Sequence, residues 1–263
     1  MNRETSTSDP IDLSAGEQYQ RRPLVGTVLT MPGAGLAELL SEPFDFVWID
    51  LEHAPLSPSE AQEMIIGIQS VGTLAFVRLP SEGWSHQLTP LIDAGVDGIV
   101  AADVRSAEQA RNLAQRLRLP PVGTRGFGPR RSGTRNRTNK LQVVQNQTPR
   151  LWAQIESPEG VRSAHDIAWV EGVEALVPGC ADLSYNLGVP MMLLSSVLHI
   201  ALGEIREAAL DAGVMFGLAG PLLPERGLGE FVVQADILMH GTDARICAAA
   251  VDDVASQLRR SPN

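Results

Sequence analysis

Short apolar runs alternate with amphipathic segments along this chain from Pro23 onward. The apolar runs are nearly continuous in hydrophobicity, which is typical of parallel strands that are covered on both faces. They lie at residues 24–29, 44–50, 73–79, 97–102, 151–156, 174–178, 213–219 and 235–241. The pattern therefore predicts eight buried parallel strands.

The segments between these runs carry helix signals. Ser57, Pro58 and Glu60 form a capping-box pattern with a proline in the first turn. A second capping-box pattern consists of Ser106 and, three residues later, Gln109. Apolar stripes follow both starts, at Ala61, Met64, Ile65 and Ile68 in the first helix and at Ala110, Leu113, Ala114 and Leu117 in the second. Gly72 can end the first helix.

The last amphipathic segment opens on Thr242. Its apolar stripe is expected to be buried against the rest of the domain. The stripe consists of Ile246, Ala249, Ala250, Val254 and Leu258.

Strands that alternate with helices in this way predict an α/β fold, a (β/α)8 TIM barrel. A doubly wound open sheet is the alternative. The sequence GAG at 33–35 hints at a dinucleotide loop, but Glu38 occupies the place of the third glycine, which weakens that reading. We expect a polar tail over residues 1–22 and a single barrel catalytic domain over residues 23–263.

Composition narrows the function classes. The chain has 263 residues, a formal net charge of −10 and a pI of about 5.0. This acidity argues against nucleic acid or an anionic membrane as the main partner. The two cysteines, Cys180 and Cys247, fit a reducing compartment rather than a disulfide framework. We therefore expect a cytoplasmic protein whose main partner is neither nucleic acid nor a membrane.

One segment departs from the acidic average. Residues 118–150 contain eight arginines or lysines and no acidic residue. Two interpretations stand side by side: a solvated loop, or an active-site loop that receives an anionic substrate.

Polar residues gather where several expected strands end. The second strand is followed by Glu52 and His53 and ends in Asp50, the third carries Arg78, the fifth carries Gln154 and Glu156, and Asp182 follows the sixth. In a barrel these ends share one face, which is where active sites form. Each residue has a plain structural explanation, such as a helix cap or a turn. Their convergence on one face favours a catalytic role for the set.

These groups suit a particular reaction. Two carboxylates form an open divalent-metal site that a chelating 2-oxo acid can complete. The metal would polarise the ketone and stabilise an enolate after carbon–carbon cleavage or deprotonation. Arg78 can hold the acid's carboxylate by a forked contact, and His53, oriented by Asp50, can move a proton near neutral pH.

Several stretches together resemble one known family. They are FDFVWIDLEHAPLS, VRLP, LIDAGVDGIVAADVRSAEQARNLAQRLRLPPVGTRGFG, AQIESPEG and VEALVPGCADLSYNLGVP. The chain resembles the HpcH/HpaI aldolases, the metal-dependent pyruvate aldolases of class II. The resemblance implies a barrel whose last helix is exchanged between subunits, within a homo-oligomer such as a hexamer built as a trimer of dimers.

The resemblance also implies roles for individual residues. Glu156 and Asp182 match the metal ligands, with Mg²⁺ expected first and Mn²⁺ or Co²⁺ as alternatives. Arg78 matches the arginine that binds pyruvate, and His53 with Asp50 matches the proton-transfer dyad. The remaining matches are Asp93, which supports the base across a subunit interface, and the substrate-binding positions Gln154, Arg125, Cys180 and Ala181.

Three features depart from the family pattern. Asp103 lies in VAADV, where the family carries a proline, and Cys180 also replaces a common proline. A reactive thiol at Cys180 is conceivable, but a small packed residue is the better interpretation. The arginine-rich loop is the third departure. All three fall where the second substrate should bind, so the acceptor stays open.

Four functions follow from these residues. The leading hypothesis is reversible cleavage of a 4-hydroxy-2-oxo acid to pyruvate and an aldehyde. The alternative is decarboxylation of oxaloacetate with trapping of the enolate, as in macrophomate synthase. A CoA-ester lyase is disfavoured, because those relatives read DLED where this chain reads DLEH, with His53. A barrel without activity would not need this full set of groups.

Overall fold

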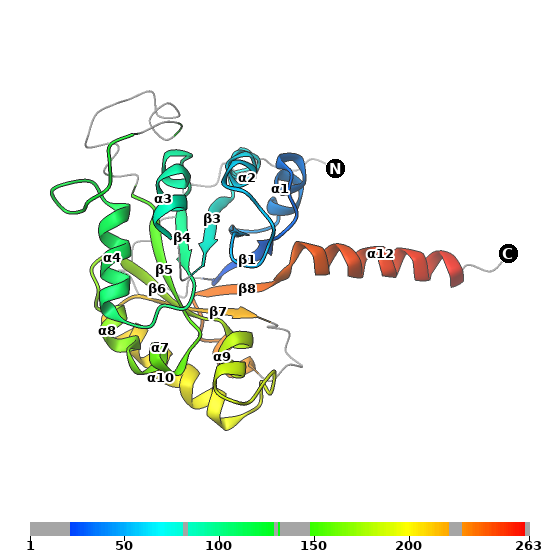
Figure 1. Cartoon of the computed structure of the whole chain (residues 1–263). Coiled ribbons are helices and arrows are strands. Elements are labelled where there is room, and N and C mark those ends of the chain that lie inside the picture. The colour runs from blue at the N-terminus through cyan, green and yellow to red at the C-terminus, as the bar shows by residue number, and fades with distance from the viewer. Residues whose placement is uncertain (1–21, 81–83, 129–130, 132–147, 221–227, 261–263) are drawn as a thin grey trace.

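A computed structural model describes residues 22–80, 84–128, 131, 148–220 and 228–260 (Figure 1). Parallel strands β1 to β8 form a closed barrel in chain order, which confirms the expected (β/α)8 fold. Each predicted apolar run overlaps one observed strand. The strands are β1 Leu24–Leu29, β2 Phe46–Asp50, β3 Leu74–Leu79, β4 Gly98–Ala101, β5 Arg150–Ile155, β6 Val173–Pro178, β7 Met215–Gly220 and β8 Ile237–Thr242.

Helices follow most strands and cover the barrel. In α2 the full capping box is present, since Ser57 accepts from the Glu60 N–H and Glu60 accepts from the Ser57 N–H at 2.7 Å. The helices are α1 Ala34–Ser41, α2 Pro58–Ser70, α3 Trp84–Asp93, α4 Ala107–Leu117, α7 Pro158–Arg162, α8 Ala164–Ala168, α9 Cys180–Asn186, α10 Ser196–Ala212, α11 Gly229–Val232 and α12 Asp243–Arg260. No described helix is both long and apolar enough to cross a membrane.

Aromatic side chains fill the interior of the barrel. The ring of Trp152 stacks on Phe76, with centroids 3.9 Å apart, and meets Phe46 edge-on at 5.0 Å. Gly98 makes room for this layer, because a Cβ there would lie 2.0 Å from the Phe76 ring. The part of the barrel interior that this aromatic layer fills is therefore a packed core rather than a channel.

This packing explains why three polar side chains point into the barrel at the carboxyl ends of the strands. Side chains alternate between the two faces of a strand, so residues two positions beyond inward-facing ones also face inward. Asp50, Arg78 and Gln154 each lie two residues after a buried aromatic residue, namely Trp48, Phe76 and Trp152. The carboxyl end of the barrel thus receives a polar layer above an apolar one.

The last helix corrects one prediction. The apolar stripe of α12 was expected to be buried, but in this chain Val254 is 56% exposed and Leu258 is 72% exposed. Figure 1 shows α12 projecting away from the barrel. Its first residue, Asp243, is buried and accepts the N–H groups of Thr30 and Met31, both at 2.9 Å, which anchors the start of the helix on the end of β1.

The expected N-terminal tail, residues 1–22, lies outside the described residues except for Arg22. The Arg22 guanidinium makes two contacts of 2.7 and 2.6 Å with the Asp45 carboxylate, just before β2.

Candidate active site

Asp50 and Arg78 form the floor of the candidate site. They are paired directly by the register of β2 and β3. The guanidinium donates from Nε to Asp50 Oδ1 at 3.1 Å and from Nη2 to Oδ2 at 2.7 Å. Both residues are buried. Burial opposes the charge on each, but the pair outweighs it, so the pKa of Asp50 is lowered and that of Arg78 is raised.

The partner of His53 differs from the expected one. Asp50 Oδ1 accepts a hydrogen bond from the backbone N–H of His53 at 3.3 Å. Both carboxylate oxygens of Asp50 also accept hydrogen bonds from Arg78. The imidazole Nε2 instead lies 3.6 Å from Glu52 Oε2, which also lies 3.3 Å from Arg78 Nη1. The expected orientation of the imidazole by Asp50 is therefore not observed. Glu52 bridges the histidine and the arginine.

Glu156 is the most perturbed carboxyl group of the cluster. Its residue is 5% exposed, and Oε1 has no hydrogen-bond partner among the described residues. Burial and then the Glu52 carboxylate raise its pKa to about 8, against the opposing effect of Arg78. Asp182 and Asp103 add to the rise. A buried acid with an unused oxygen that faces other carboxylates favours a bound cation.

Local structure excludes the plain explanation for Glu156. Ser157, not Glu156, caps α7, because its hydroxyl accepts from the Gly160 N–H at 3.3 Å. Asn186 donates to the Glu156 carbonyl at 2.6 Å and so ties the end of α9 to the end of β5. Asp182 occupies the first turn of α9 and is exposed.

These residues fit a hard divalent cation. A Cβ added at Gly179 would lie 2.2 Å from Glu156 Oε1 and 2.8 Å from Gln154 Nε2, so glycine keeps this place clear. No group of three or more acidic, histidine or cysteine ligands gathers in the described part of the chain. Glu156 and Asp182 alone would leave positions for water and a chelating oxo acid, as Mg²⁺ sites often do.

Three expected substrate-binding residues differ in placement. Gln154 is buried beside Gly179, and its Oε1 has no partner within the described residues. Ala181 is half-buried in the first turn of α9. Cys180, by contrast, packs wholly in the core, where burial raises the pKa of its thiol to about 12. The Cys180 side chain is therefore a packing group rather than part of the site.

Asp93 and Arg125 do not join the cluster within one chain. Asp93 ends α3 and Arg125 follows α4, so both lie near the amino ends of the strands, opposite the polar layer. Arg125 Nη2 contacts Asp93 Oδ1 at 3.2 Å. Arg131 also belongs there, since it donates to the Ala94 carbonyl at 3.0 Å. The described part of the arginine-rich segment is thus not an active-site loop of its own barrel. Residues 129–130 and 132–147 lie outside the described residues.

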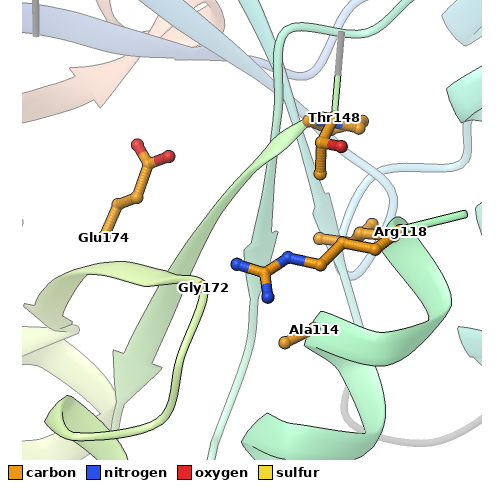
Figure 2. Close-up of a pocket in the computed structure, with 7 residues that line it drawn as sticks. Ala114, Arg118, Thr148, Gly172 and Glu174 are labelled. Carbon is orange, nitrogen blue, oxygen red and sulfur yellow. The ribbon is translucent and has the colours of Figure 1, made fainter. Parts of the chain in front are cut away.

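A cavity of about 220 Å³ lies at this same amino end (Figure 2). It is lined by Ala114, Leu117, Arg118, Thr148, Pro149, Gly172 and Glu174. None of the expected site residues lines it. Arg118 already pairs with Glu171 at 2.9 Å and Glu174 with Arg150 at 2.9 Å, so the charges near the cavity are satisfied.

Comparison with known proteins identifies the family. The family model described as HpcH/HpaI aldolase/citrate lyase matches residues 34–246. The chain belongs to this family. The resemblance seen in the sequence is therefore confirmed, and the chain is an enzyme, a carbon–carbon lyase of the aldolase kind.

Individual relatives support the family assignment. The chain is 32% identical to a hydroxypyruvate/pyruvate aldolase of Rhizorhabdus wittichii over 75% of this chain and 79% of the relative. It is 30% identical to the 4-hydroxy-4-methyl-2-oxoglutarate aldolase tasA of Hapsidospora irregularis, over 84% and 86%. It is 28% identical to a 4-hydroxy-2-oxo-heptane-1,7-dioate aldolase of Shigella flexneri, over 91% and 90%.

Solved structures agree with the fold. An HpcH/HpaI aldolase from Desulfitobacterium hafniense superposes with a TM-score of 0.82 at 25% identity, covering 92% of this chain and 95% of that one. Macrophomate synthase superposes with a TM-score of 0.75 at 22% identity, covering 91% and 86%. At that identity the second likeness supports the barrel alone.

Proposed function

We propose that this chain catalyses the reversible cleavage of a 4-hydroxy-2-oxo acid to pyruvate and an aldehyde. The observation that carries the proposal is the buried Glu156 carboxyl group, which faces acidic neighbours and Arg78 at the carboxyl end of the barrel. A divalent cation, together with Arg78, would offset the acidic groups and so favour binding of an anionic oxo acid. The names of the aldolase relatives support the substrate class.

Glu156 and Asp182 would hold a divalent cation, with Mg²⁺ first and Mn²⁺ or Co²⁺ as alternatives. When bound, this metal would supply Lewis acidity that draws charge toward the ketone oxygen of the oxo acid. Gln154 is buried next to Gly179, as Glu156 is, and would contact the same ligand.

Arg78 would bind the carboxylate of the oxo acid. Asp50 takes up Nε and one N–H of Nη2, and Glu52 lies 3.3 Å from Nη1, so the guanidinium is fixed. The N–H groups that these two carboxylates leave would serve the ligand. This arrangement lowers the ordering cost of binding, because the arginine is already held in one rotamer.

His53 would take the proton of the C4 hydroxyl during cleavage and return it during synthesis. Its side chain is 63% exposed at the mouth of the barrel, where an entering aldehyde passes. Glu52 Oε2 lies 3.6 Å from Nε2, beyond a hydrogen bond, and its negative charge would stabilise the imidazolium that forms.

We extend the proposal to the assembly, a cytoplasmic homo-oligomer such as a hexamer built as a trimer of dimers. The exposed apolar stripe of α12 supports an exchange of this helix between subunits. Asp93 and Arg125 lie at the end of the barrel away from their own site, so any role in catalysis would be in the site of another copy.

The test follows the methyl protons of pyruvate in D2O by NMR. The metal-loaded protein should exchange them, and removal of the metal with EDTA or the substitution Glu156→Gln should abolish the exchange. Glu63→Gln, a surface change on α2, should leave it intact. Absence of exchange in the loaded wild type would overturn the proposal.

Product analysis separates the alternatives. Aldol cleavage and oxaloacetate decarboxylation should both occur. Decarboxylation without cleavage of any 4-hydroxy-2-oxo acid would instead favour a decarboxylative synthase.

A further inference from the structure

Asp103 holds an unusual place at the end of β4. Its φ of 47° lies in the left-handed region, which non-glycine residues seldom adopt. The chain on both sides is fixed, since Ala102 N–H donates to the Leu79 carbonyl at 3.1 Å and Val104 N–H donates to the Gln154 carbonyl at 2.9 Å. Backbone conformations of this kind concentrate at functional positions.

The two oxygens of the Asp103 carboxylate have different surroundings. Arg105 donates from Nε to Oδ2 at 2.7 Å, from the exposed side. Oδ1 is buried and has no hydrogen-bond partner in the described part of the molecule. The hydrogen bond from the Val104 N–H to the Gln154 carbonyl also places Asp103 beside the end of β5, where Gln154 lies two residues before Glu156. Arg105 therefore fixes the carboxylate, with one acceptor atom left for a donor that arrives with a ligand.

We propose that Asp103 selects the aldehyde, with Oδ1 accepting a hydrogen bond from a hydroxyl group of a neutral hydroxyaldehyde. The inference rests on the proposed aldolase function and adds the class of the second substrate. The hydroxyl donor satisfies an oxygen that is otherwise buried without a partner.

The charges around the site point to the same class of aldehyde. Glu52, Asp103 and Asp182 follow the carboxyl ends of β2, β4 and β6, and the buried Glu156 follows β5 at the same end of the barrel. Arg78 pairs with Asp50 and contacts Glu52, and Arg105 pairs with Asp103. A second carboxylate on the aldehyde would therefore meet like charges, whereas a hydroxyl group would not.

The test compares kcat/KM for three acceptors at saturating pyruvate: glyceraldehyde, propanal and succinic semialdehyde. The wild type should prefer glyceraldehyde to propanal by about tenfold, the factor expected of one hydrogen bond to a charged group. Succinic semialdehyde should be the poorest acceptor, because it carries the repelled charge.

Two variants address the role of Asp103. In Asp103→Asn the amide oxygen would turn toward Arg105 and leave an NH2 donor facing the site. This donor can reach only the hydroxyl oxygen, by a neutral hydrogen bond, so the preference for glyceraldehyde should fall by several-fold. Asp103→Gly removes the carboxylate and tolerates the positive φ, which keeps the test decisive if the asparagine variant fails to fold. Both should improve the relative rate with succinic semialdehyde.

Glu108→Gln, an exposed acid in the first turn of α4, is the matched control and should keep the wild-type ratios. Unchanged ratios in both Asp103 variants, a wild-type preference for succinic semialdehyde, or turnover of none of these aldehydes would overturn the inference while pyruvate exchange persists. Loss of pyruvate exchange itself would overturn the proposed function and this inference together.

Discussion

At the scale of single residues, the candidate site depends on which acid pairs with which base. Asp50 was expected to orient His53 from three residues away, but the β2–β3 register places it beside Arg78. Local spacing does not reveal such a cross-strand pair, whereas strand register does. The sequence identified Glu156 and Asp182 as candidate ligands, but Glu52 had no assigned role, because its contacts depend on the turn after β2.

Glu52 therefore gives the first prediction. Glu52→Gln should reduce kcat for aldol cleavage by about tenfold, because the imidazole of His53 loses its charged neighbour. The kcat of oxaloacetate decarboxylation should fall by less than that of cleavage, since no hydroxyl proton moves in that reaction, while the lost contact with Arg78 should affect KM in both. Steady-state kinetics of both reactions measure the difference, with Glu63→Gln as the control. Equal losses in both would reject this role for Glu52.

Glu156 gives a prediction about pH. In the metal-free fold its pKa is raised from 4.5 to about 8. Between these values the folded state holds a proton that the unfolded state releases, so the free energy of unfolding should fall as pH rises through this window. Glu156→Gln should flatten the curve. Urea unfolding of EDTA-treated protein measures both, and a wild-type curve as flat as that of the variant would contradict the assignment.

At the scale of elements, the apolar runs predicted the strands and the residue types predicted the helix caps. They did not predict what packs against the apolar face of each helix. The capping box of α2 follows from neighbouring residues, so the sequence sufficed there. At α4 only half of the expected box forms, because Ser106 accepts from the Gln109 N–H while Gln109 Oε1 accepts from the Arg105 N–H. For α12 the apolar stripe is present, but in this chain it stays exposed. The interpretation of residues 118–150 as an active-site loop used only the positive charge of the segment. Its place after a helix and before a strand already indicated the amino end of the barrel.

The stripe of α12 gives a prediction about assembly. Replacing Val254 and Leu258 together by lysine should convert the oligomer to smaller species without unfolding the barrel, because both side chains are exposed in the single chain. Analytical ultracentrifugation reports the size and circular dichroism reports the fold. Asp252→Lys, another exposed position on α12, should leave the size unchanged. A wild-type monomer would contradict the proposed exchange.

At the scale of the whole molecule, the closed barrel explains why residues from β2, β3, β5 and α9 converge. Eight apolar runs, their order and the helices between them were enough to predict this architecture, because parallel strands with crossover helices have few alternatives. The assembly and the identity of the aldehyde depend on surfaces and groups contributed by other molecules. A single sequence constrains these far less.

Calorimetric titration of the metal-free protein with Mn²⁺ in the presence of pyruvate tests the metal site most directly. We predict saturable uptake by the wild type and its loss in both Glu156→Gln and Asp182→Asn, with Glu108→Gln behaving as the wild type. No uptake by the wild type, or unchanged uptake by the two variants, would contradict a cation held by Glu156 and Asp182.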